Sequence, residues 1–126
     1  MKRIRVESLK NQALIADKCD EAERFFDRLK GLIGRAQLAH DEALWIPRCN
    51  SVHMWLMSFS IDVVFVKDAA VMPDGKKIFV ITSLHSDVPA GKLLPLFDFR
   101  ASHALELAAG SIAKNALSVG DELCIG

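Results

Sequence analysis

The sequence predicts an α+β fold, in which a mostly antiparallel, coiled or barrel-like β-sheet carries a helix on one side. Three observations support this fold class. Several short apolar segments, rich in β-branched residues, are separated by turn residues, as in antiparallel sheets. One segment, about residues 20–34, repeats apolar residues at helical spacing. No regular series of helical segments alternates with the strands, which argues against a doubly wound parallel sheet.

The chain opens with a predicted β-hairpin. Residues 3–7 alternate charged and apolar side chains, which is the pattern of a strand with one face in water. Lys10-Asn11 then supplies a turn before a second strand through Leu14 and Ala16. We therefore expect two antiparallel strands at the start of the chain.

A long helix is predicted over about residues 20–34. Asp20 is suited to the N-cap, and Glu23, three residues later, completes a pattern like a capping box. Gly34 is suited to the C-terminal end of the helix. The apolar side chains between these residues form one stripe, made of Ala22, Phe25, Phe26, Leu29, Leu32 and Ile33.

The middle of the chain is predicted to be mostly strand. Apolar and β-branched residues favour strands over residues 43–46, 49–57, 61–66 and 78–81. Pro73-Asp74-Gly75 is a strong turn signal between the last two of these strands. We expect a long loop over residues 82–101, because Pro89, Gly91 and Pro95 disfavour regular structure there.

The C-terminal part adds a strand over residues 103–107, a short helix over about residues 111–117 and a last strand over residues 122–125. Ser111 is the expected N-cap of the short helix. A chain of 126 residues fits one core, so we expect a single domain over residues 1–126.

Composition narrows the classes of partner. The 16 basic and 16 acidic residues give zero net charge, and no basic patch is interleaved with aromatic residues, so nucleic acid is not an expected partner. The three cysteines form no CxxC pair, which favours free thiols in a reducing compartment. Neither a signal peptide nor an apolar stretch of ~20 residues is evident. We therefore expect a cytoplasmic protein without a membrane span.

A set of short motifs runs in order from about residue 20 to the end of the chain. They are Arg24 with Arg28–Arg35, Leu44–Ile46, Asn50–Met57, Ile61–Phe65, Leu105–Gly110 and Gly120–Leu123. As an ordered set they resemble the prokaryotic family known as domain of unknown function 192. The resemblance implies a small, mostly β fold with a helix, and no agreed biochemical activity. The connection between Val66 and Ile78 is longer than the family's usual hairpin.

Asp62 and Glu106 are candidate functional residues because each lies inside an apolar strand segment. A carboxylate in such a place either faces water or is buried with a partner, since an unpaired buried charge is costly. Two interpretations stay open. The carboxylates tie the helix to the sheet through arginines, or they line a polar groove for a small ligand. The candidate partners are Arg24, Arg28, Arg35 and Arg48.

Residues 48–53 form the densest group of reactive residue types. On an extended strand, Cys49 and His53 would share a face about 13 Å apart, which is too far for the histidine to activate the thiol. The four histidines lack the close paired spacing of zinc ligands, so we expect no metal site. The chain also lacks a phosphate-binding glycine loop and a nucleophile elbow, and we expect no cofactor.

These observations favour a non-catalytic accessory module that binds a small polar ligand or a protein partner, as a monomer or small homo-oligomer. Trp55 beside His53 would offer a stacking surface if its ring is exposed, although core packing is its ordinary role. The alternative is a small hydrolase- or transferase-like enzyme that uses His53 with Asp62 or Glu106 as acid and base. The predicted ligand-binding residues are Arg48, Asn50, His53, Trp55, Asp62 and Glu106.

Overall fold

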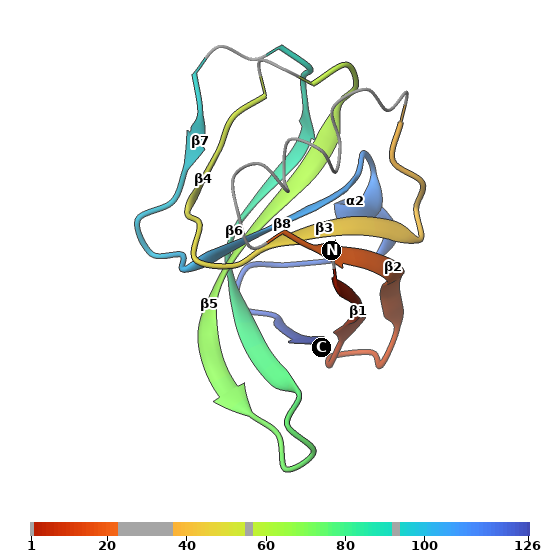
Figure 1. Ribbon diagram of the computed structural model, residues 1–126, viewed down its shortest axis with the longest axis vertical. Helices are drawn as coiled ribbons and strands as arrows, with labels where there is room; N and C mark the ends of the chain where they lie inside the picture. Colours follow the sequence, from red (N-terminus) through yellow and green to blue (C-terminus); the bar gives the residue numbers. More distant parts are fainter. Residues whose placement is uncertain (1, 23–36, 55–56, 92–93) are drawn as a thin grey trace.

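A closed β-barrel forms the body of the protein (Figure 1). The computed structural model describes residues 2–22, 37–54, 57–91 and 94–126. The barrel strands follow the order β1, β2, β3, β8, β5, β6 and β9, and β9 pairs with β1 to close the circle. Their bounds are β1 Lys2–Ser8, β2 Leu14–Glu21, β3 Glu42–Ile46, β5 Ile61–Val71, β6 Lys77–Val88, β8 His103–Ala108 and β9 Glu122–Ile125. The predicted barrel-like sheet is confirmed.

The pairing is antiparallel except between β2 and β3, which run parallel. The predicted N-terminal hairpin is β1 with β2. A separate two-stranded sheet consists of β4 (Ser51–Val52) and β7 (Leu96–Phe97), which lie side by side at the upper left of Figure 1. The helix labelled α2 spans Ser111–Lys114 and lies beside the barrel end where β5 begins.

The predicted start of the long helix at Asp20 is wrong. Asp20 and Glu21 are the last residues of β2, and Asp20 pairs with Arg3 on one side and Leu44 on the other. The ladder continues into Ala22, whose N–H donates to the Trp45 carbonyl at 2.8 Å. These backbone hydrogen bonds between strands outweigh the local capping pattern. The rest of that prediction, residues 23–34, lies outside the described residues.

The short helix is confirmed in place but is shorter than predicted. It ends at Lys114, and its N-cap is Gly110 in place of the expected Ser111. Gly110 has a φ of 92°, a left-handed conformation that glycine adopts without steric cost. Helix α2 is the one helix among the described residues. In that part of the chain the fold is therefore mostly β, and the predicted α+β class is correct only for its β-sheet.

The predicted strand over residues 49–57 is largely wrong. Only Ser51–Val52 are strand residues in its described part, and residues 55–56 lie outside the description. Arg48 has a φ of 55°, so the chain turns directly after Pro47. The Cys49 N–H then donates to the Ser102 carbonyl at 3.0 Å.

The predicted loop over residues 82–101 is also wrong in its first half. Strand β6 continues to Val88, and β7 lies within the same segment. The residues that suggested a loop, Pro89, Gly91 and Pro95, all lie beyond the end of β6. The long connection between Val66 and Ile78 is likewise mostly strand. The predicted turn at Pro73-Asp74-Gly75 joins β5 to β6 in a hairpin that projects below the barrel in Figure 1.

Two hydrophobic cores lie on the two faces of β3, β8 and β5. One fills the barrel interior and includes Trp45, Val64 and Leu105. The other covers the outer face of the same strands and includes Leu44, Val63 and Ala104. Strands that are buried on both faces read as continuous apolar runs. This explains why the segments at Ala43–Ile46, Ile61–Val66 and Ala104–Ala108 lack alternation.

Candidate functional site

Asp62 and Glu106 lie on opposite faces of the same sheet. Asp62 is opposite Leu107, which belongs to the core inside the barrel. Glu106 is opposite Val63, which belongs to the outer core. Directly opposite residues of an antiparallel pair point to the same side of the sheet. The register therefore separates the two carboxylates that the sequence suggested could share one groove.

Asp62 is fully buried and bonds to backbone amides. Its Oδ1 accepts a hydrogen bond from the Asp87 N–H, and its Oδ2 accepts one from the Ile112 N–H, both at 2.8 Å. Charge-assisted bonds of this kind offset much of the cost of burying a carboxylate. Asp62 thus ties β5 to the end of β6 and to the first turn of α2.

Glu106 is also fully buried, with Leu44 and Val63 as its cross-strand neighbours. Three of its candidate arginine partners, Arg24, Arg28 and Arg35, lie outside the described residues. The expected tie between Glu106 and an arginine therefore stays a prediction.

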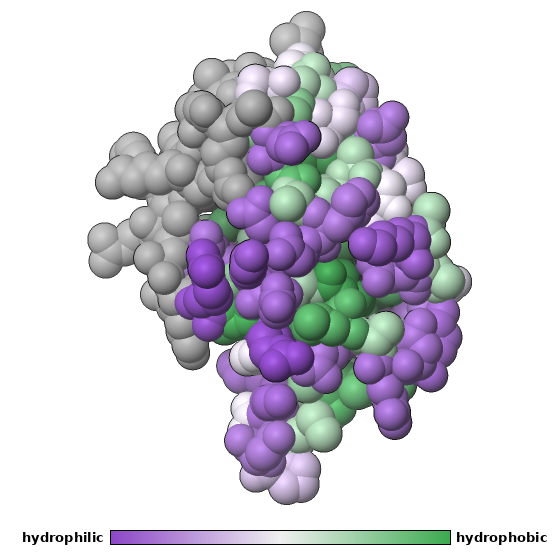
Figure 2. Space-filling view, turned by 90° about the vertical axis from the view of Figure 1, so that its right-hand side faces the viewer, coloured by the Kyte–Doolittle hydropathy of each residue, from purple (hydrophilic) through white to green (hydrophobic). Residues whose placement is uncertain are grey.

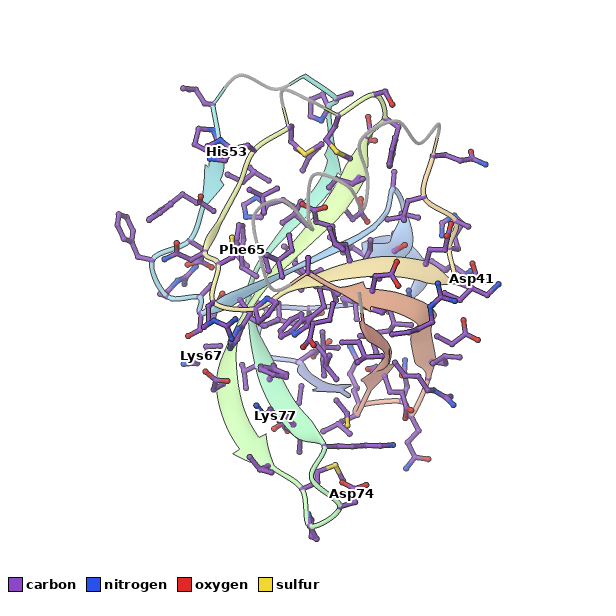
Figure 3. All side chains as sticks on the ribbon, in the orientation of Figure 1. Asp41, His53, Phe65, Lys67, Asp74 and Lys77 are labelled. Atoms are coloured by element: carbon purple, nitrogen blue, oxygen red, sulfur yellow. The ribbon has the colours of Figure 1, made fainter. Side chains whose placement is uncertain are left out.

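The other predicted site residues are spread over two regions. His53 is half-buried just after β4, and Figure 3 draws it beside β7, far from Asp74. Trp55 lies outside the described residues. Arg48 and Asn50 lie together on a surface hollow of about 380 Å³ that also includes Asp68 and His103.

A second hollow, of about 340 Å³, lies between β2 and the segment leading into β3. Figure 2 views this side, which is mostly hydrophilic with a small hydrophobic area between polar side chains. Asp41, which lines the hollow, already forms an ion pair with Lys18 at 3.1 Å. Asp17 is the other acidic residue of the hollow. Since Asp41 is already paired, we do not regard this hollow as the main candidate site.

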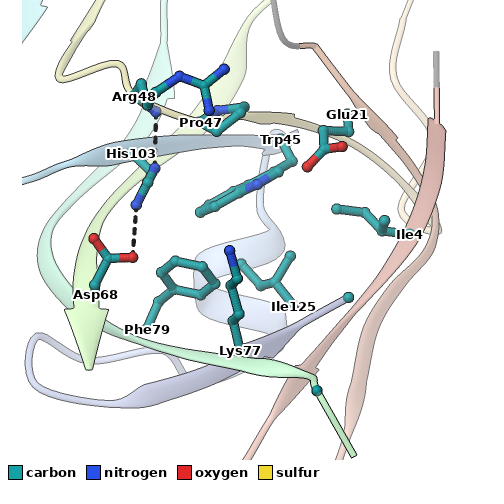
Figure 4. A pocket seen from close by; sticks show the side chains of 12 residues that line it. Ile4, Glu21, Trp45, Pro47, Arg48, Asp68, Lys77, Phe79, His103 and Ile125 are labelled. Atoms are coloured by element: carbon teal, nitrogen blue, oxygen red, sulfur yellow. Dashed lines mark hydrogen bonds and ion pairs between the residues drawn. The ribbon is translucent and has the colours of Figure 1, made fainter. Parts of the chain in front are cut away.

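The strongest candidate is a cavity of about 360 Å³ at one end of the barrel, here called the barrel-end pocket (Figure 4). All seven barrel strands contribute to it, and α2 lies at the other end. Its apolar residues are buried, and its charged residues surround the opening. The apolar set is Ile4, Trp45, Phe79 and Ile125, and the charged set is Glu21, Arg48, Asp68 and Lys77.

Three rings in the wall of the pocket contact one another. The ring centroids of Trp45 and Phe79 are 4.9 Å apart, and His103 lies 5.2 Å from each of them. The tilted and edge-on arrangements are the favourable ones for aromatic pairs. This packing stabilises the wall of the pocket.

Both ring nitrogens of His103 are engaged. Its Nδ1 accepts a hydrogen bond from the Arg48 N–H at 2.9 Å, so the proton of the neutral ring lies on Nε2. Nε2 is 3.1 Å from Asp68 Oδ1 and donates to it. A general base needs a ring nitrogen that can accept a proton, and both nitrogens of His103 already form hydrogen bonds within the protein.

Only one of the charged side chains around the opening forms a hydrogen bond with a described residue. Asp68 bonds to His103, whereas the side chains of Lys77, Arg48 and Glu21 form no hydrogen bond or ion pair with any other described residue. Figure 4 shows Lys77 and Glu21 pointing into the pocket from different sides. The arrangement can bind a small polar molecule above an apolar floor.

The sequence did not single out most of this pocket. Arg48 was a predicted site residue, and Trp45, Lys77 and Phe79 were not. An aromatic residue in a short strand is an ordinary core residue, so only the barrel register brings these side chains together. Within the described residues, no group of three or more His, Cys, Asp or Glu side chains could hold a metal ion. Burial raises the pKa of the Cys19 thiol to about 12, so this cysteine is not a reactive thiolate.

The fold and the pocket define a small closed β-barrel with a cavity at one end. The chain belongs to the family DUF192, described as "Uncharacterized ACR", whose model matches residues 6–125. The resemblance found in the sequence is therefore confirmed. A search of the curated proteins finds no significant match. Within the described residues, no helix combines the length and hydrophobicity required to cross a membrane.

Two solved structures share the fold. A protein from Sinorhizobium meliloti 1021, described as a "putative transcription regulator", is 21% identical, with a TM-score of 0.73 over 96% of this chain and 90% of that one. A protein of unknown function from Novosphingobium aromaticivorans DSM 12444 is 17% identical, with a TM-score of 0.70 over 96% of this chain and 82% of that one. At these identities the likeness concerns the fold alone.

Proposed function

We propose that this protein is a non-catalytic binding module whose barrel-end pocket takes a small polar ligand. The observation that carries the proposal is the contrast within one cavity between a buried apolar floor and charged side chains at the opening. Lys77, Arg48 and Glu21 have no ion-pair partner among the described residues. Pockets for small molecules combine apolar walls with a few polar groups that set orientation.

The geometry favours binding over catalysis. His103, the titratable ring in the pocket, has both nitrogens in hydrogen bonds to Arg48 and Asp68. The enzyme alternative pairs His53 with Asp62 or Glu106. Both oxygens of Asp62 already accept backbone hydrogen bonds on the inner side of the sheet, which leaves that carboxylate poorly suited to proton transfer.

A fragment screen followed by nitrogen-15 NMR tests the proposal. We expect bound fragments to perturb the backbone amides of Trp45, Phe79 and His103, and to leave those of Ile15 and His40 in the second hollow unchanged. K77A should weaken these fragments at least fivefold, and K67A, a matched change at an exposed lysine outside the pocket, should not. Fragments that map only to other surfaces, or none that bind, would contradict the proposal.

Protein binding is a second candidate function, supported by the phenylalanine ridge, Phe97 and Phe99. Their side chains are 48% and 88% exposed, and their rings meet edge-on at 4.5 Å. Asp98 between them is buried and accepts hydrogen bonds from Thr82 and Ser83 at 2.6 and 2.7 Å. Exposed apolar groups presented by an ordered turn are typical of a contact surface, and we propose a second copy of this chain as the partner.

A further inference from the structure

We infer that the barrel-end pocket accepts a small zwitterion, with a cationic group against Glu21 and an anionic group against Lys77. The inference rests on the proposed function, because it names the class of ligand for the same cavity. Its basis is that one cavity presents a carboxylate and an ammonium group that have no hydrogen-bond or ion-pair partner among the described residues.

The barrel topology keeps these two charges from neutralising each other directly. Glu21 is the last residue of β2, and Lys77 is the first residue of β6. In the barrel order, β1 and β9 lie between these strands, so the two side chains approach the opening from different sides (Figure 4). No ion pair within 4.0 Å joins them, and a molecule between them would contact both.

The opposite charges of Glu21 and Lys77 disfavour ligands that carry charge of only one sign. A simple anion near Lys77 and Arg48 would also meet the carboxylate of Glu21, which is half-buried and therefore poorly screened. A simple cation near Glu21 would meet Lys77. A zwitterion satisfies both groups at once, and this complementarity does not depend on Asp68, which bonds to His103.

The floor of the pocket indicates what the uncharged part of the ligand is. Ile4, Trp45, Phe79 and Ile125 form an apolar floor, and the cavity volume of about 360 Å³ is near the lower end for small-molecule sites. These properties suit a compact apolar body that carries an ammonium and a carboxylate group, as in an α-amino acid with an apolar side chain.

A matched series of four probes tests the inference. L-Phenylalanine is the zwitterion, N-acetyl-L-phenylalanine the anion, L-phenylalanine methyl ester the cation, and N-acetyl-L-phenylalanine methyl ester the neutral form. All share one apolar body. Binding to the intact protein is measured by nitrogen-15 NMR titration at pH 6, so that the amino groups of L-phenylalanine and of its methyl ester are protonated. We expect the zwitterion to bind at least tenfold more tightly than each of the other three.

Two variants, with K67M as their control, test which group of the ligand Glu21 and Lys77 each contact. E21Q should remove the preference for L-phenylalanine over its N-acetyl form, and K77M should remove the preference over the methyl ester. K67M should change neither preference. Both pocket residues are at least partly exposed, and a preserved amide spectrum identifies folded variants.

The outcomes separate this inference from the proposed function. If the anion, the cation or the neutral form binds the pocket as well as the zwitterion does, the ligand class is wrong while the binding pocket stands. If none of the four binds but the fragment screen finds ligands for the pocket, the inference is again overturned alone. If neither the four probes nor any fragment binds the pocket, the inference and the proposed function are both overturned. Zwitterion binding that E21Q and K77M leave unchanged also overturns the inference.

Discussion

Asp62 shows how a buried carboxylate is satisfied without an arginine. Its two oxygens accept hydrogen bonds from the amides of Asp87 in β6 and Ile112 in α2. Such a residue stabilises the fold by joining elements. The sequence correctly marked Asp62 as unusual, because an acidic residue within an apolar strand requires an explanation. It did not identify the partners, since backbone amides leave no signature in the sequence.

Replacing Asp62 with asparagine should lower the free energy of unfolding by about 2–4 kcal/mol. The asparagine amide group would face one of the two backbone N–H donors and leave it without an acceptor. Urea denaturation monitored by circular dichroism measures the change. D41N is the matched control, because Asp41 is exposed, and it should change the stability far less than D62N does. A D62N protein as stable as the wild type would contradict the structural role of Asp62.

Asp98 is the second informative carboxylate. Burial alone would raise its pKa, but hydrogen bonds from Thr82, Ser83 and Arg100 outweigh burial and lower the pKa to about 2. A folded-state pKa below the unfolded value of about 3.8 means that Asp98 stabilises the fold above pH ~4. This contribution disappears as the pH falls through 2.

The difference in stability between wild type and D98N should therefore depend on pH. We expect the wild type to exceed D98N by about 2 kcal/mol or more at pH 6, and the gap to narrow by about 2 kcal/mol as the pH falls from 4 to 2. Urea denaturation of both proteins across this pH range measures the gap. Other carboxylates affect both proteins equally, so a gap that stays constant with pH would show that the pKa of Asp98 is not lowered.

Helix α2 is too short to be stable alone, and its position depends on contacts at both of its ends. Asp62 accepts the Ile112 N–H in its first turn, and Gly110 supplies the left-handed residue that leads from β8 into the helix. The chain after α2 also contributes to the barrel core through Leu117. The helix ends at Lys114, although the sequence pattern extends to residue 117, because Asn115 is its C-cap and Ala116 has a φ of 50°.

Replacing Gly110 with alanine should destabilise the protein by about 1 kcal/mol. The space around an added Cβ is sufficient, with the nearest neighbour, His40, at 3.9 Å, so the cost comes from the positive φ. Thermal unfolding measures the loss. G126A is the control, since this glycine has no positive φ and an added Cβ would make ordinary contact with Lys76 at 3.6 Å. Equal melting temperatures for G110A and wild type would refute the conformational argument.

The molecule as a whole buries β3, β8 and β5 on both faces, and the ridge of Phe97 and Phe99 lies away from both cores. Phenyl rings in water favour association, because apolar area removed from water stabilises a contact by about 25 cal/mol per Å². The phenylalanine ridge therefore bears on the oligomeric state more than on the stability of the monomer.

If the ridge meets a second copy, the wild-type protein should sediment as a dimer at concentrations of about 100 μM or below, and F99S should shift it to the monomer. The 88% exposure of Phe99 predicts that F99S leaves the melting temperature unchanged. Sedimentation velocity of the two proteins, with V71S as a control at another exposed apolar residue, measures the effect. A wild type that remains monomeric over this range would exclude the second copy as partner.

Much of the fold could be predicted from the sequence. The opening hairpin, the strands at Ile61–Val66 and His103–Leu107 and the turn at Pro73-Asp74-Gly75 all depend on local patterns, because alternation and turn chemistry act between near neighbours. The errors have a common cause. Asp20 carries a local signal for a cap, and the predicted loop includes residues 82–88 because Pro89, Gly91 and Pro95 follow them. Hydrogen bonds to neighbouring strands nevertheless hold both in the barrel.

The candidate site also depends partly on residue types that the sequence shows and partly on the tertiary structure. The residue types alone identified Asp62 and Glu106 as unusual and Arg48 as a site residue. The register of β5 against β8 determined that the carboxylates lie on opposite faces, since adjacent positions of paired strands point to opposite sides. The barrel-end pocket arises in the same way. Its residues, from Ile4 to Gly126, become neighbours only when hydrogen bonds between distant strands close the barrel.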